Sequence, residues 1–242
     1  MTGLPDAATA HAWIVPLDAP ETLREGLEQC LSPAEKARLD ACATEEARRR
    51  FILGRGVLRH LLSRYTGVAA PDLALLRGEL GKPYLGTDDS LHFSLSHSLD
   101  TAVVALARDE TGVDVEHDRV PARLDRIARR VLHPDTVALL DAAEDTQRTQ
   151  LFLEAWTLRE AHVKAIGGGL FHTPDTVPFT PGIPADGVLR SVRERAGGSE
   201  WSLARFRPGD GLRAAVVVRG AVTSLVIHDA GETRRLIMEA VS

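Results

Sequence analysis

The sequence predicts an α+β fold built from two similar halves. Two long segments space their apolar residues as helices do, each ends at glycine, and short strand-like runs follow each glycine stop. RFILGRGVLRHLLSRYTG in the first half compares with LFLEAWTLREAHVKAIGGG in the second, and TAVVALA compares with RAAVVVR. We therefore expect two subdomains in a pseudo-twofold arrangement, residues 1–112 and 113–242, each a long helix packed on a small antiparallel β-sheet.

Local signals predict the elements of the first half in chain order. An apolar run bounded by proline predicts a strand at 11–17, and Ser32 followed by Pro33 marks the start of a short helix. Helical spacing of apolar residues extends from 45 to 65, and Gly67 closes this helix. Strand-like runs follow at residues 73–76, 92–95 and 101–107.

The second half repeats this order of elements. The β pattern continues through residues 114–116, and a second long helix is predicted from 150 to 166, stopping at the glycines 167–169. Residues 173–198, rich in proline and glycine, predict a long surface excursion. Strands at 201–206, 212–219 and 222–228 are expected to complete the sheet of this half.

Composition narrows the class of protein. With 242 residues, 44% apolar and 26% charged, the chain has the make-up of an ordinary globular protein. Its net charge of −5 argues against nucleic-acid binding, which needs a basic surplus. Cys30 and Cys42 form no CxxC pattern, so we expect neither a disulfide framework nor a zinc site. Without a signal-peptide pattern or an apolar run of about 18 residues, we expect a cytoplasmic protein with no membrane contact.

The motif GVDVE predicts a strand with two carboxylates on one face. Because residues i and i+2 of a strand point the same way, Asp114 and Glu116 share a face while Val113 and Val115 pack behind them. Two carboxylates this close suit Mg²⁺, which proteins bind through one or two carboxylates together with phosphate oxygens. The alternative is an exposed edge strand with its polar residues directed to solvent.

The motif WTLREAHVKA predicts a helix with functional groups along one stripe. Trp156, Glu160 and Lys164 fall at i, i+4 and i+8, and Arg159 adds a second cation beside Glu160. A surface ion pair between Glu160 and Lys164 is the simpler interpretation. Trp156 argues against it, because a large aromatic side chain marks a partly buried face. Three carboxylates and a lysine on separate elements suit a divalent metal that acts on a phosphate ester.

Further polar motifs suit a phosphate. HFSLSHS predicts a strand with a Ser-His-Ser end, where Ser96 and His97 are able to hydrogen-bond a phosphate. A hydrolase is one alternative for this Ser-His pair, although no G-x-S-x-G elbow surrounds it, and a plain polar turn is another. GKP places Lys82 on a turn, and Arg50 lies in the arginine-rich start of the first long helix. No GxxxxGK[ST] or GxGxxG pattern indicates a nucleotide-binding fold.

Taken together, the motifs resemble a known family. The order GKPYL, HFSLSHS, GVDVE and WTLREAHVKAIGGGL is similar to that of the surfactin-type 4′-phosphopantetheinyl transferases, and LSPAEKARL and RRRFILGR resemble that family's first half. The resemblance implies an active site in the cleft between the two halves. It also implies transfer of phosphopantetheine from coenzyme A to a serine of an acyl carrier protein or peptidyl carrier domain, releasing adenosine 3′,5′-bisphosphate.

The resemblance also implies roles for individual residues. Asp114, Glu116 and Glu160 would hold Mg²⁺, or Mn²⁺ in its place, against the pyrophosphate of coenzyme A. Glu160 would be the base for the serine proton, and Lys164 would stabilise charge on the phosphate. Contacts with the phosphates and ribose of coenzyme A are implied for Arg50, Lys82, Ser96, His97 and, from an earlier helix, Lys36 or Arg38. Where many relatives carry lysine before the helix glutamate, this chain has Arg159, which is expected to keep a phosphate contact with different geometry.

Carrier proteins are acidic, and the segment after GVDVE offers a surface for one. Arg123, Arg126 and Arg130 share a helical face with Ile127 and Val131 beside it, although a plain solvated helix has the same pattern. We expect a monomer, because the cleft would be completed within one chain. Two other functions fit the motifs: a catalytically silent homologue that binds coenzyme A or a carrier protein, and another metal-dependent phosphotransferase or hydrolase.

Overall fold

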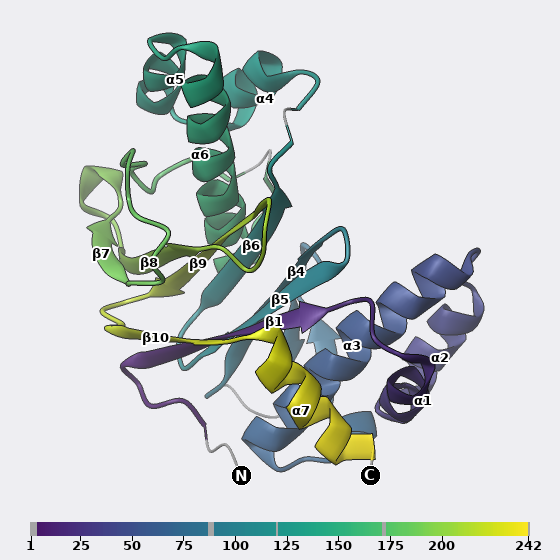
Figure 1. Ribbon diagram of the computed structural model, residues 1–242. Coiled ribbons are helices and arrows are strands. Elements are labelled where there is room, and N and C mark those ends of the chain that lie inside the picture. The colour runs from purple at the N-terminus through teal and green to yellow at the C-terminus, as the bar shows by residue number, and fades with distance from the viewer. Residues whose placement is uncertain (1–3, 87–89, 120, 171–172, 242) are drawn as a thin grey trace.

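The computed structural model describes residues 4–86, 90–119, 121–170 and 173–241 (Figure 1). Its main elements are two four-stranded sheets with helices packed against them, which confirms the α+β class. The first sheet has the order β10 (Ser224–His228), β1 (Thr9–Pro16), β5 (Thr101–Ala107) and β4 (His92–Ser98). The second has the order β6 (Thr111–His117), β9 (Leu212–Arg219), β8 (Glu200–Phe206) and β7 (Arg190–Arg193). The pseudo-twofold relation and the division at residue 112 stay predictions.

A long helix packs on the first sheet. α3 (Glu45–Thr66) is capped at its start by Thr44, whose hydroxyl accepts the Ala47 N–H, and at its end by Gly67, where a φ of +76° suits glycine. The predicted helix and its glycine stop are therefore confirmed. The apolar side of α3 packs with α1 (Glu21–Gln29) and the sheet around a core that includes Trp13, Val15, Leu53, Leu58, Leu61, Phe93, Val104 and Leu106.

Shorter elements surround these sheets. α2 (Pro33–Asp40) begins at the predicted Ser32, whose hydroxyl accepts the Glu35 N–H. A small hairpin pairs β2 (Leu75–Arg77) with β3 (Pro83–Leu85), and 3₁₀ turns lie at Ala70–Asp72 and Arg195–Gly197. In the second half, α4 (Leu124–Val131) and α5 (Pro134–Asp141) pack against α6 (Asp145–Ala165). Within the described residues, no helix has the length and apolar character needed to cross a membrane.

α6 lies directly on β6 and β9 (Figure 1). Gly112, Asp114 and Glu116 alternate along β6 with two valines, so the first three face α6 while the valines enter a core shared by both sheets. A Cβ on Gly112 would lie 1.9 Å from the Ala161 carbonyl oxygen. The helix backbone therefore rests on the strand at a position that only glycine can occupy.

β4 and β6 lie side by side where the two sheets meet. The Ser94 hydroxyl accepts the Val113 N–H at 3.1 Å, and the Ser96 hydroxyl accepts the Val115 N–H at 3.4 Å. Serine oxygens thus take the place of the backbone carbonyls that would accept these amides in a continuous sheet. The junction consequently carries polar side chains at its edge.

The prediction that residues 222–228 complete the second sheet was wrong. β10 pairs in parallel with β1 of the first sheet, from Thr9 beside Ser224 to Trp13 beside His228, and does not complete the second sheet. Both edges of β9 are already taken, by β6 and β8, so the chain cannot fold back beside it as a hairpin. α7 (Ala230–Val241) then packs against α1 and β1, which brings the end of the chain onto the first half (Figure 1).

Candidate active site

A polar cavity of about 370 Å³ lies where β4, β6 and α6 meet. It brings together the predicted carboxylates, the helix lysine and the Ser-His pair, and two apolar residues complete its wall. The lining residues are Leu95, Ser96, His97, Asp114, Val115, Glu116, Glu160 and Lys164. Residues from three separate motifs therefore form one site.

Matched positions along β6 and α6 bring the charged groups together. Gly112 lies against the backbone near the end of α6, Asp114 meets Lys164, and Glu116 meets Trp156. β6 and α6 run in opposite directions. The residues of β6 that face the helix, two positions apart along the strand, therefore lie successively closer to the start of α6. The contact at Gly112 thus sets the distance between β6 and α6 at Asp114 and Glu116.

Asp114 lies in a dense hydrogen-bond network. Lys164 Nζ donates to Asp114 Oδ1 at 2.6 Å and to Ser96 Oγ at 2.9 Å, and the Ser96 hydroxyl donates to the same Asp114 oxygen at 2.9 Å. Asp114 is 3% exposed, and its second oxygen, Oδ2, is buried without a hydrogen-bond partner. A buried carboxylate oxygen in this state is costly unless a cation or another donor reaches it.

The electrostatics of the cavity favour an added positive charge. Burial raises the pKa of Asp114 to about 6, even though Lys164 and Ser96 act to lower it. Burial also raises the pKa of Glu160, which Lys164 counteracts. The negative charge of Glu116 raises the pKa of both Asp114 and Glu160 further, because it disfavours a second negative charge nearby. One ammonium group therefore does not fully compensate the three carboxylates.

These residues fit a divalent cation that is shared with a phosphate ligand. The unpartnered Oδ2 of Asp114 is an available oxygen donor, and carboxylate oxygens are the ligands that Mg²⁺ takes from proteins. In the described part of the chain, no three His, Cys, Asp or Glu side chains converge into a ready-made metal cage. Mg²⁺ does not require one, because substrate phosphates and water complete its octahedral shell.

Arg159 is a correction to the predicted coenzyme A contacts. Its side chain lies on the buried side of α6, 3% exposed, and donates to the carbonyl oxygens of Val131, Leu170 and Thr173. Asp175 lies beside it, with 3.8 Å between Nε and Oδ1. The guanidinium therefore ties the segment after α6 to the helix and lies away from the cavity that Glu160 faces.

Lys82, just before β3, contacts the last turn of α6 in space. It is not among the described residues that line the polar cavity. Its ammonium donates to the carbonyl oxygens of Thr111 at 3.1 Å and Ala165 at 2.5 Å. Burial lowers the pKa of Lys82 to about 8, with Glu110 acting in the opposite direction. The amine thus neutralises the carbonyl end of the helix, and its contact with a phosphate stays a prediction.

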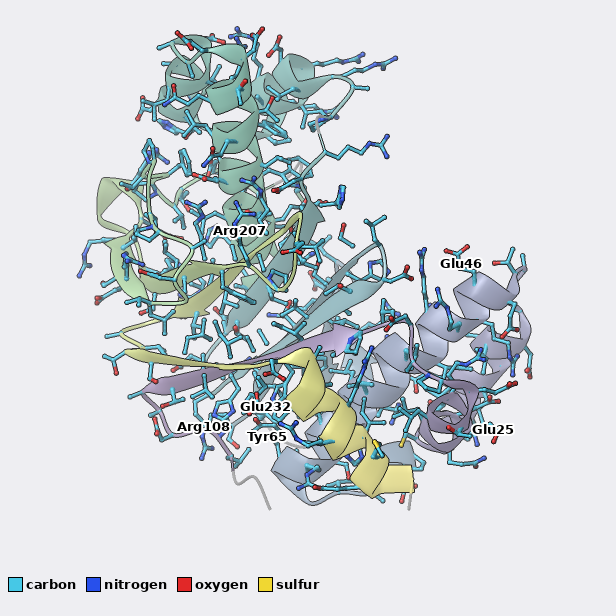
Figure 2. All side chains as sticks on the ribbon, viewed as in Figure 1. Glu25, Glu46, Tyr65, Arg108, Arg207 and Glu232 are labelled. Carbon is cyan, nitrogen blue, oxygen red and sulfur yellow. The ribbon has the colours of Figure 1, made fainter. Side chains whose placement is uncertain are left out.

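The remaining predicted cations lie on helices of the first half. Arg50 pairs with Glu46 at 2.8 Å and with Asp100, in the turn after β4, at 3.4 Å. Figure 2 labels Glu46 near the start of α3. Lys36 and Arg38 lie on α2. The Arg38 guanidinium stacks over the ring of Phe51, with 5.4 Å between its Cζ and the ring centroid. Their phosphate contacts, like that of Arg50, stay predictions.

A second cavity of about 370 Å³, mainly apolar, adjoins the first through Glu116. It is lined by Ser98, Leu99, Glu116, His117, Arg119, Pro121, Ile127, Phe152, Leu153 and Trp156. The Trp156 indole N–H donates to Glu116 Oε1 at 3.0 Å. The helical stripe predicted that Trp156 is partly buried, but no sequence signal indicated this hydrogen bond or the cavity beside it.

Comparison with known proteins identifies the family. A model of the 4′-phosphopantetheinyl transferase superfamily matches residues 110–217, and a model of the 4′-phosphopantetheinyl transferase N-terminal region matches residues 21–109. The 4′-phosphopantetheinyl transferase HetI of Nostoc sp. is 35% identical over 215 residues, which cover 87% of each chain. The chain belongs to the 4′-phosphopantetheinyl transferase superfamily. The predicted resemblance and the transferase class are therefore confirmed.

Other relatives match a smaller part of the chain. The 4′-phosphopantetheinyl transferase Sfp of Bacillus subtilis is 27% identical over 140 residues, covering 58% of this chain and 62% of its own. The 4′-phosphopantetheinyl transferase AcpT of Escherichia coli is 35% identical over 122 residues, covering 50% of this chain and 59% of its own. The boundary between the two matched family models, at residues 109 and 110, lies just before β6.

Proposed function

We propose that the chain transfers 4′-phosphopantetheine from coenzyme A to a serine of an apo acyl or peptidyl carrier protein in a Mg²⁺-dependent reaction. The observation that carries the proposal is the polar cavity, which three carboxylates (Asp114, Glu116 and Glu160) line together with Lys164, whose ammonium contacts Asp114. Family membership supplies the group that is transferred. Coenzyme A is the substrate in this proposal, and adenosine 3′,5′-bisphosphate is the product released with the modified carrier.

The transfer requires a base for the serine proton and positive charge to stabilise the leaving group. The carrier serine oxygen forms a bond to the β-phosphorus of the coenzyme A pyrophosphate, the bond from that phosphorus to the bridging oxygen breaks, and the serine proton leaves. Glu160 is the proposed acceptor of this proton, because its raised pKa makes the carboxylate a stronger base than an exposed glutamate. The electron pair departs with the bridging oxygen of adenosine 3′,5′-bisphosphate.

The other residues of the cavity hold and neutralise the phosphates. Asp114 and Glu116 would hold the metal ion, and Asp114 Oδ2 is the buried oxygen available to it. When bound, Mg²⁺ supplies positive charge to the phosphate oxygens during transfer. Lys164 is fixed by Asp114 and Ser96, so its ammonium adds a positioned charge beside the same phosphates. His97 is exposed at the cavity edge, where its ring is able to contact an entering anion.

The direct test is the intact mass of a purified apo carrier protein after incubation with this enzyme, coenzyme A and Mg²⁺. We expect a gain of one phosphopantetheine, its loss when EDTA removes the metal, and its recovery when Mg²⁺ is added in excess. Asp114→Ala is expected to give no gain, because it removes the buried oxygen proposed for the metal. Absence of any gain with fatty-acid, polyketide and peptidyl carriers would contradict the proposed function.

We further propose that the carrier docks over α4, beside the apolar cavity. Arg126 and Arg130 are exposed on this helix, and Ile127 from the same helix lines the apolar cavity next to Glu116. Arg129 of the same helix pairs with Asp141 of α5 at 2.8 Å. An apolar pocket rimmed by arginine suits an acidic protein that presents a few apolar side chains.

Reversing the two exposed charges tests this surface. With Arg126→Glu and Arg130→Glu together, we expect KM for the carrier to rise roughly tenfold, since an attractive rim becomes repulsive. Affinity for coenzyme A, measured by titration calorimetry, should stay unchanged. The matched control is Arg234→Glu with Arg235→Glu on α7, which changes the net charge equally on the other half of the molecule (Figure 1). Equal KM values for the two double variants would refute docking over α4.

A further inference from the structure

Trp156 makes a polar contact with one of the proposed metal-binding carboxylates. Its indole N–H donates to Glu116 Oε1 at 3.0 Å and so connects α6 to the end of β6. We propose that Trp156 is a positioning residue, which holds the Glu116 carboxylate in the orientation that binds the metal. This inference rests on the proposed function, because it assigns to Glu116 the role of a metal ligand.

Glu116 needs an external support that Asp114 does not. Asp114 is buried and already held by Lys164 and Ser96, whereas Glu116 is half-buried near the end of its strand. A glutamate side chain is also longer and has more rotamers to lose on ordering. The like charges of Asp114 and Glu160 repel it toward solvent. A hydrogen bond that fixes one oxygen selects the rotamer in which the second oxygen is left for a cation.

An indole suits this task better than a charged donor would. The Trp Nε1–H is a donor only and carries no charge. A lysine or arginine at this position would neutralise Glu116 and compete with the metal, as an opposite charge within a few ångströms does. The indole therefore orients the carboxylate while leaving its negative charge for the ion. Carboxylates that ligate metals are commonly held by such outer hydrogen bonds.

The indole ring is itself held in place by its surroundings. Phe152, one helical turn earlier, packs against it with ring centroids 5.9 Å apart and planes inclined by 25°. Ile127 and Leu153 line the same apolar cavity. Trp156 and Glu116 together line this cavity, while Glu116 also lines the polar one. The ring thus forms a rigid apolar support on one side of the carboxylate.

Trp156→Phe tests the inference, because it removes the N–H and keeps an aromatic ring. The measurement is Mn²⁺ binding to the enzyme with coenzyme A, followed by electron paramagnetic resonance of the free ion, so no turnover is needed. We expect Mn²⁺ to bind about tenfold more weakly in the variant, within the range for lost support of metal ligands. In assays, the apparent KM for Mg²⁺ should rise by a similar factor, with a smaller change in kcat at saturating Mg²⁺.

A double-variant cycle separates the hydrogen bond from general damage. In a Glu116→Ala background, Trp156→Phe should weaken Mn²⁺ binding no further, because the carboxylate that it supports is gone. An equal loss in both backgrounds would overturn the inference, and so would Mn²⁺ affinity in Trp156→Phe equal to that of the unsubstituted enzyme. If the unsubstituted enzyme bound no Mn²⁺ with coenzyme A, the proposed metal site itself would be wrong and this inference would fall with it.

Discussion

Glu160→Gln is expected to lower kcat by about 10²- to 10⁴-fold, the usual contribution of a general base. The amide keeps the shape of the side chain but cannot accept the proton of the carrier serine. Coenzyme A affinity should change much less, because Ser96, His97 and Lys164 remain in the cavity. Single-turnover transfer to an apo carrier protein, followed by intact mass, measures the effect on the chemical step.

The same substitution should leave stability unchanged or raise it. Burial and Glu116 raise the pKa of Glu160 in the folded protein, so at pH 7 the ionised carboxylate opposes folding. Removing the charge relieves this cost at every pH above the unfolded-state pKa. Thermal unfolding near pH 7 is therefore expected to give an equal or higher Tm for Glu160→Gln. Lost activity with a preserved fold distinguishes a catalytic role from a structural one.

Glu144→Gln is the matched control. It makes the same chemical change at the start of α6, where the side chain is exposed and forms no capping hydrogen bond. Its kcat should equal that of the unsubstituted enzyme. Near-normal transfer by Glu160→Gln would exclude Glu160 as the base and move that role to another group at the cavity.

Strands and helices with strong local signals were predictable from the sequence. β5 and β9 occupy the residues predicted for them, and α3 stops at Gly67 as its left-handed φ requires. The partner of β10 was not predictable, because it depends on which sheet edges other strands have already filled. α1 was missed for a different reason: this nine-residue helix carries only two large apolar side chains, Leu23 and Leu27, which form too short a pattern to indicate a helix.

The site was predictable to the extent that local geometry determines where a side chain points. Strand alternation correctly placed Asp114 and Glu116 on one face, and helical spacing placed Glu160 and Lys164 together. The predicted place of Arg159 in the site was wrong, because adjacent helix residues differ by about 100° in direction. Its side chain therefore points away from that of Glu160 and into the interior. Proximity in sequence therefore did not imply a shared site on this helix.

Gly112→Ala is expected to destabilise the fold by about 3 kcal/mol or more, at the upper end of the range for overpacking. The added Cβ would lie 1.9 Å from the Ala161 carbonyl oxygen and 2.4 Å from the Ala165 amide nitrogen. Both are backbone atoms of α6, so no side-chain rotamer relieves the clash and the helix must move off β6. For a chain of this size, we expect a fall in Tm of roughly 6–12 °C.

The same displacement should reach the catalytic groups. The Gly112 contact sets the distance from β6 to α6, and the 2.6 Å bond between Lys164 and Asp114 lies two strand residues away. A shift of about 1 Å in such a site costs on the order of 10²-fold in rate. We therefore expect kcat to fall even at temperatures where the variant remains folded, which circular dichroism and transfer assays on the same samples would show.

Two comparisons isolate the backbone clash at Gly112. Gly54→Ala on α3 adds the same methyl group where no atom beyond the adjoining backbone of α3 and the two chain neighbours lies within 4 Å, and it should raise stability slightly, because alanine favours a helix interior. Combining Gly112→Ala with Ala161→Gly should not restore stability, since the atom in the way is the Ala161 carbonyl oxygen and not its side chain. Recovery of Tm in that double variant, or a Gly112→Ala protein as stable as the unsubstituted one, would show that α6 does not rest on β6 at this glycine.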